Sequence, residues 1–112
     1  MPRNMSFMLT TAQVRERTKT VTRRLGWKFL KPGTIINACV KCQGLKKGEK
    51  VVVMCQIRIV SVRKEALYTI TKEDVVKEGF PDYEIWQFIE MFMKHINCFS
   101  DTIVNRIEFE YI

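Results

Sequence analysis

A long alternating segment near the middle of this 112-residue chain, KVVVMCQIRIVSVRKEAL at residues 50–67, limits the possible folds more than any other part of the sequence. Apolar side chains recur there at every second position, which is the period of a β-strand. The first half carries apolar residues on both faces, as in a strand at the centre of a sheet, and the second half is amphipathic. The sequence therefore predicts a long central strand.

Three shorter strands are predicted from the same kind of alternation. They are KTVTRR, TIINACV and IVNRIEFEYI, at residues 19–24, 34–40 and 103–112. In the last of them, Ile107 and Phe109 share an apolar face, and Arg106 lies on the opposite, polar face.

Three helical segments complete the expected order. The first begins at Thr10, which is spaced to form a capping box with Gln13. The second begins after Thr71 and ends near Gly79, and the third covers residues 81–97, with apolar residues at i, i+3 and i+4 spacing. The predicted order is one helix, three strands, two helices and a final strand.

This order lacks the regular alternation of strands and helices that builds parallel sheets. We therefore expect an α+β protein with a curled mixed or antiparallel sheet and helices at its margin. A chain of 112 residues is long enough for one core and too short for two ordinary ones. No linker divides it, so residues 1–112 are predicted to form a single domain.

The charge is strongly unbalanced: 19 Lys and Arg against 12 Asp and Glu leave a net charge of +7. Such an excess favours a polyanionic partner such as nucleic acid, although solubility alone also explains it. The start MPRNMSFML lacks the apolar run of a signal peptide, and VVVMC is too short to cross a bilayer. We expect a cytoplasmic protein, a monomer, with no membrane partner.

The cysteines and the histidine do not form a recognisable metal or catalytic motif. Cys39 and Cys42 form a C-x-x-C pair, but zinc needs four ligands, and Cys55, Cys98 and His95 supply no second pair. Residues i and i+3 of a strand also point in opposite directions. We expect thiols, no metal and no cofactor, and a structural role for His95 near a helix end.

The segment RTKTVTRRLGW, residues 17–27, packs four cations and three threonines into eight positions. An exposed strand edge protected by charge is one interpretation. Alternatively, the turn before the strand can bring the Lys19 amine close to the Thr22 hydroxyl. A lysine whose pKa is lowered by burial or by neighbouring arginines can act as base for a hydroxyl nucleophile. Trp27 either packs as a lid or stacks on a base.

The same segment resembles the signature of the ASCH domain family, small proteins with a fold like the PUA RNA-binding domain. The family pattern is G-x-K-x-x-E-x-R; Lys19 and Arg24 match it, while Arg17 replaces the glycine and Thr22 the glutamate. A threonine in that position resembles the ASCH branch that hydrolyses the acetyl amide of N4-acetylcytidine. The resemblance implies a PUA-like curled sheet, or small β-barrel, and RNA or a modified nucleoside as partner.

In that branch the catalytic set is a lysine, a threonine and a glutamate. Lys19 and Thr22 match the first two, and Glu78 lies at the position that matches the third. The resemblance implies that Thr22 attacks the acyl carbon or orients a water that does so. Lys19 would accept the proton or stabilise the oxyanion, and Glu78 would protonate the leaving amine.

Three further residues of the segment, Arg24, Trp27 and Arg23, are candidates for substrate binding. Arg24 would fix the pocket or a carboxylate through its planar guanidinium, and Trp27 would stack on the base. Arg23 is a further candidate contact to substrate, although it and Arg17 are expected to lie at the protein surface.

Two other functional classes stay open. A PUA-like RNA-binding module would use Lys19, Arg23 and Arg24 to hold phosphates and would need no chemistry from Thr22. A small basic interaction protein of phage or prophage origin is the third class. A nuclease mechanism with two histidines is excluded, because His95 is the sole histidine.

Overall fold

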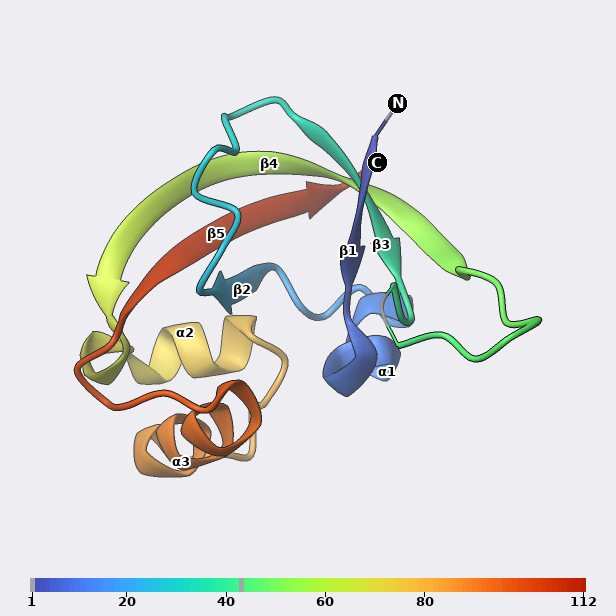
Figure 1. The fold of residues 1–112 in the computed structure, drawn as a ribbon. Helices are drawn as coiled ribbons and strands as arrows, with labels where there is room; N and C mark the ends of the chain where they lie inside the picture. The colour runs from blue at the N-terminus through green and yellow to red at the C-terminus, as the bar shows by residue number, and fades with distance from the viewer. Residues whose placement is uncertain (1, 43) are drawn as a thin grey trace.

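The computed structural model describes residues 2–42 and 44–112, which form a strongly curled five-stranded sheet with short helices on its concave side (Figure 1). The strand order is β1-β3-β4-β5-β2. The strands are β1 (Arg3–Ser6), β2 (Val21–Arg24), β3 (Ile35–Cys39), β4 (Val53–Ala66) and β5 (Ile103–Tyr111). β1 and β3 are parallel and all other neighbours are antiparallel. The predicted α+β class and the curled mixed sheet are confirmed.

The long central strand is confirmed as β4, which pairs with β3 on one side and β5 on the other. Its register with β5 shifts by one residue between Ile59 and Ser61. Such a bulge bends a strand and increases its twist. This irregularity helps a 14-residue strand to curve over the helices.

The sheet is open, with β1 and β2 as its edges, and does not close into the small barrel that the resemblance implied. Both edge strands are only four residues long. Among the described residues, a side chain joins them: Arg24 of β2 donates a hydrogen bond from Nη2 to the carbonyl oxygen of Ser6 in β1 (2.6 Å).

The predicted helices are present and lie on the concave side of the curled sheet (Figure 1). They are η1 (Met8–Thr10), α1 (Thr11–Arg15), η2 (Leu67–Thr69), α2 (Lys72–Lys77) and α3 (Ile85–Ile96). Thr71 caps α2 by accepting a hydrogen bond from Asp74 N, and Asn97 ends α3 in the left-handed conformation (φ 59°). α3 begins one turn later than predicted, because Glu84 and Gln87 form its capping box.

Two local predictions are wrong. β1 was not predicted, because four residues are too few to show a period, and its pairing with β3 is a long-range contact. The capping box between Thr10 and Gln13 does not form. Instead, Gln13 Nε2 donates a hydrogen bond to the carbonyl oxygen of Gly79 (3.2 Å), which ties α1 to the end of α2.

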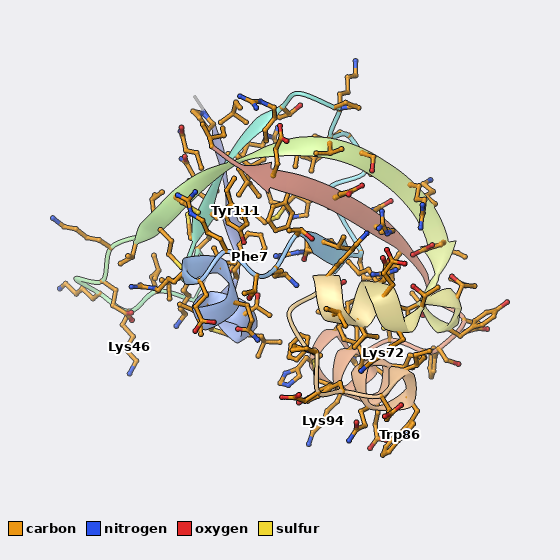
Figure 2. All side chains as sticks on the ribbon, turned by 180° about the vertical axis from the view of Figure 1, so that it is seen from behind. Phe7, Lys46, Lys72, Trp86, Lys94 and Tyr111 are labelled. Atoms are coloured by element: carbon orange, nitrogen blue, oxygen red, sulfur yellow. The ribbon has the colours of Figure 1, made fainter. Side chains whose placement is uncertain are left out.

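The buried apolar side chains form two clusters. One lies under the sheet and contains Met5, Phe7, Val14, Leu30, Ile36, Ala38, Ile57, Ile59, Ile107 and Phe109. The other lies between the sheet and the helices and contains Leu67, Ile70, Val75, Phe88, Phe92 and Val104. Figure 2 shows Phe7 and Tyr111 beneath the curved sheet. A set of buried charged residues, described next, belongs to neither cluster.

Candidate active site

A cavity of about 190 Å³ opens beside β2, where members of both apolar clusters meet. Its polar wall consists of Lys19, Thr22, Arg23, Arg24 and Glu78. Phenylalanine and methionine side chains form its apolar wall; half of them come from α3 and the others are Phe7, Met8 and Phe80. We call this space the β2 cavity.

Backbone contacts bring the segment before β2 against the end of α2. Thr20 N donates a hydrogen bond to the carbonyl oxygen of Lys77 (2.8 Å), and Glu78 is the C-cap residue of α2. Gly79 follows with φ +102°, a conformation that favours glycine, and turns the chain away. Tyr111 Oη donates to the carbonyl oxygen of Lys19 (2.5 Å). Hydrogen bonds to the backbone therefore bring Lys19 and Glu78 next to each other.

The side chains of Lys19 and Glu78 form a buried ion pair. Lys19 Nζ lies 2.6 Å from Glu78 Oε1 and 2.8 Å from the Glu78 carbonyl oxygen, and both side chains are less than 5% exposed. Burial lowers the pKa of Lys19, the Glu78 carboxylate opposes this shift, and Arg24 and Arg23 add to the lowering. The pair holds a lysine with weakened proton affinity at the wall of a cavity, a combination typical of functional sites.

Arg23 is buried, so its predicted place at the surface is wrong. Its guanidinium contacts three carboxylates: Glu65 Oε1 at 2.5 Å, Asp74 Oδ2 at 2.6 Å and Glu78 Oε2 at 3.2 Å. The contact to Glu78 fixes the second carboxylate oxygen of the ion pair. Arg23 Nε has no hydrogen-bond partner among the described residues. The structure thus gives Arg23 a positioning role, and its contact with substrate stays a prediction.

Arg106 is also buried, against the prediction that it lies on a polar face. It donates from Nε to Asp74 Oδ2 (2.6 Å) and from Nη2 to Asp74 Oδ1 (3.0 Å). Those hydrogen bonds hold the pKa of Asp74 well below its usual range against the opposing effect of burial, with further lowering by Arg23. No local signal in the sequence marks Asp74 or Glu65 as a partner of these arginines.

Thr22 and Arg24 lie on the same face of β2, two residues apart. Arg24 Nε donates a hydrogen bond to Thr22 Oγ1 (3.0 Å), which orients a buried hydroxyl toward the β2 cavity. No hydrogen bond joins Lys19 Nζ to Thr22 Oγ1 among the described residues. The structure thus places Lys19, Thr22 and Glu78 around one cavity, with direct contact only between Lys19 and Glu78.

Trp27 does not line the β2 cavity, whereas His95 borders it. Trp27, at φ 68°, borders a neighbouring cavity, and its ring packs against Phe29 with centroids 5.7 Å apart. His95 is exposed on α3 at the rim of the β2 cavity. Its predicted place near the end of the helix is correct, but the sequence did not indicate that it borders the cavity.

The cysteines carry free thiols. Burial raises the pKa of Cys39 to about 11, and the neighbouring Cys42 adds to this shift. Within residues 2–42 and 44–112, no three His, Cys, Asp or Glu side chains are grouped so that they could hold a metal ion. In the same ranges, no helix has the length and apolar character needed to cross a membrane.

Comparisons by sequence find no matching family model and no matching curated protein. Solved structures do match. An ASCH domain from Lactobacillus crispatus superposes with a TM-score of 0.74 at 14% identity, over 97% of this chain and 78% of that one. The fold is that of an ASCH domain. The ASCH resemblance is therefore confirmed for the fold, and the N4-acetylcytidine branch stays a prediction.

Two further structures share the ASCH-like fold. A protein from Enterococcus faecalis assigned to the family DUF984 matches with a TM-score of 0.69 at 16% identity, over all of this chain and 80% of that one. The hypothetical protein PH0355 matches with a TM-score of 0.69 at 18% identity over both full chains. At such identities the similarity establishes the ASCH-like fold alone.

Proposed function

We propose that this protein hydrolyses the acyl amide of a modified nucleoside of the N4-acetylcytidine type. The observation that carries the proposal is the buried 2.6 Å ion pair of Lys19 and Glu78, in the wall of a cavity that Thr22 also lines. A buried ion pair contributes less to stability than well-packed apolar side chains of similar volume. Its place at a cavity next to a hydroxyl therefore favours a chemical role.

The geometry favours one assignment of the catalytic roles to Glu78, Thr22 and Lys19. Glu78 accepts hydrogen bonds from Lys19 and Arg23, and in the proposed reaction Glu78 acts as the base and Lys19 as an ammonium. As the oxygen of Thr22, or of a water held by Thr22, bonds to the acyl carbon, Glu78 takes its proton. The Lys19 ammonium stabilises the oxyanion that forms.

The intermediate then collapses with cleavage of the C–N bond. Glu78 returns the proton to the leaving amino group of the nucleoside, which completes an acid–base cycle on one carboxyl group. If water attacks, acetate is the second product. If Thr22 attacks, its acetyl ester is hydrolysed by water in a second step and releases the same acetate.

The two walls of the β2 cavity suit such a substrate. The polar wall carries the groups that meet the amide, whereas Phe88, Phe92 and Met91 on the other wall offer apolar contact to an uncharged base. A small planar substrate can thus place its amide against the polar residues and its base against the apolar residues.

The test is acetate release from N4-acetylcytidine by the purified protein. Thr22→Val keeps the shape of the side chain and removes the hydroxyl, so it should lower the rate by about a hundredfold or more. Thr20→Val is the matched control: Thr20 is partly buried, does not line the β2 cavity and should keep the rate within about twofold. A wild-type rate no higher than that of the Lys19→Ala, Glu78→Ala double variant would contradict the proposal.

RNA binding is a second candidate function, and the positive charge at the protein surface favours it. The buried charged residues are three cations, Lys19, Arg23 and Arg106, and two carboxylates, Asp74 and Glu78. Most of the net charge of +7 therefore remains at the surface. Binding of an RNA oligonucleotide should weaken steeply as salt rises, whereas turnover of an uncharged nucleoside should change little.

A further inference from the structure

A second cavity of about 310 Å³ adjoins the β2 cavity and shares Ser6, Met8 and Arg24 with it. We call it the Trp27 cavity, because Trp27 lines it together with Lys41. Sites for drug-sized ligands measure about 300–1,000 Å³, and the β2 cavity alone is smaller than this. A ligand larger than an acylated base would therefore extend past Arg24 into the Trp27 cavity.

Arg24 lines both cavities, and no carboxylate of the described residues forms a salt bridge with it. Among the residues that the structure describes, the buried cations Lys19, Arg23 and Arg106 each contact a carboxylate within 2.6 Å. Arg24 instead donates to two neutral oxygens, Thr22 Oγ1 and the Ser6 carbonyl. Because Arg24 is half-buried and has no carboxylate in direct contact among these residues, its guanidinium favours an anionic ligand.

The surroundings of Arg24 keep it charged and in place. Its guanidinium lies 4.8 Å from the centroid of the Phe7 ring. Burial lowers the pKa of Arg24 to about 10, with the Glu78 carboxylate opposing that shift. Even so, Arg24 remains a cation at neutral pH.

Lys41 adds a second positive charge to the lining of the Trp27 cavity, and it makes no ion pair among the described residues. Trp27 lines the same cavity and has a left-handed backbone conformation (φ 68°), which is rare for a residue other than glycine. Two cations beside an aromatic ring make a site suited to a phosphate attached to a nucleoside.

We propose that the substrate carries a phosphate ester, with its acylated base in the β2 cavity and its phosphate between Arg24 and Lys41 in the Trp27 cavity. The acyl part of this inference rests on the proposed function, whereas the phosphate part rests on the charges of the Trp27 cavity. A free nucleotide and the phosphorylated end of an RNA chain present the same chemistry.

Calorimetric titration of the wild-type protein with unacylated ligands tests the phosphate site without any turnover. We expect cytidine 5′-monophosphate or 3′-monophosphate to bind about tenfold more tightly than cytidine. Lys41→Ala should reduce this advantage to about threefold or less. The matched control is Lys46→Ala, because Lys46 projects into solvent from the same loop (Figure 2) and lines neither cavity.

Three results would overturn the phosphate site: equal affinity for cytidine and both monophosphates, no detectable binding of any of them, or equal losses from Lys41→Ala and Lys46→Ala. A trinucleotide with a terminal phosphocytidine distinguishes the sources. Tighter binding than the monophosphate indicates an RNA end, and equal or weaker binding indicates a free nucleotide; both support the phosphate site.

Acetate release separates this inference from the proposed function. Hydrolysis of N4-acetylcytidine and its monophosphates with equal kcat/KM would support the proposed function and contradict the phosphate site. Phosphate-dependent binding without acetate release from any of these compounds would keep the site and remove the proposed function.

Discussion

Arg23 and Arg106 lie directly opposite one another in the β2–β5 ladder, and both guanidinium groups bind the carboxylate of Asp74. Like charges at directly opposed positions of a sheet repel. Asp74, which projects from α2, compensates both cations and thereby attaches that helix to the sheet. Because Arg23 also contacts Glu78, this structural network reaches the candidate active site.

Replacing Asp74 by Asn should destabilise the protein by about 3–5 kcal/mol, because two buried guanidinium groups would lose their shared counter-ion. Urea denaturation measures the free energy of unfolding. Asp101→Asn is the control, since Asp101 is exposed and should change stability by less than about 0.5 kcal/mol. Similar losses in the two variants would show that the network contributes no specific stability.

The lowered pKa of Asp74 predicts acid sensitivity with a definite sign. The folded protein holds this carboxylate more firmly ionised than the unfolded chain does, so its stabilising contribution is complete above the unfolded pKa of about 3.9. It is lost as pH falls through the lower folded pKa. Denaturation from about pH 5 to about pH 2 should show a falling free energy of unfolding, with a shallower fall in Asp74→Asn. Equal slopes in both proteins would contradict this assignment.

Lys19 and Glu78 should be strongly coupled in a double-mutant cycle of Lys19→Met and Glu78→Gln. Glu78→Gln leaves Lys19 buried without a carboxylate and should cost about 3–5 kcal/mol, whereas Lys19→Met should cost less, because Glu78 keeps its contact with Arg23. The double change should cost less than the sum of the two single changes. The exposed pair Lys77–Glu73, at 3.2 Å, is the matched control and should couple by about 0.5 kcal/mol or less. Additive losses at Lys19 and Glu78 would show that the pair is not a unit.

Gly79→Ala should disturb both stability and the position of Glu78. Gly79 has φ +102°, and an added Cβ would lie 2.7 Å from Gln13 Cγ, so we expect a loss of about 1–3 kcal/mol. The rate of acetate release should fall together with the stability, because Glu78 of the ion pair immediately precedes this turn. Gly26→Ala meets no atom within 4 Å and should be nearly neutral. Equal behaviour of the two variants would refute the proposed constraint.

Local patterns predicted much of the fold because their physical causes are local. The alternation of β4 and β5 and the Thr71 cap depend on neighbouring residues alone. The capping box at Thr10 failed because Gln13 found a partner 66 residues away, at Gly79. A local signal is decisive only where no distant group competes for the same atoms.

In the candidate site, too, local signals predicted some residues and long-range contacts determined the others. The spacing of Lys19, Thr22 and Arg24 along the chain indicated an amine, a hydroxyl and a cation within reach of one another, and Glu78 came only from the ASCH resemblance. Arg23 was expected at the surface because charged side chains are seldom buried. Its partners Glu65, Asp74 and Glu78 are 42 to 55 residues distant in sequence, so no local pattern could indicate its burial.

Local patterns were enough to predict the α+β class, the long central strand and the reactive residue types before and within β2. The burial of the charges, the pairing of Lys19 with Glu78, and the place of Arg24 at two cavities without a salt bridge to the described residues emerge only in the folded chain. A pKa or an ion pair depends on distance and solvent exclusion in three dimensions. These are set by how α2 docks against β2, a contact that neither segment encodes alone.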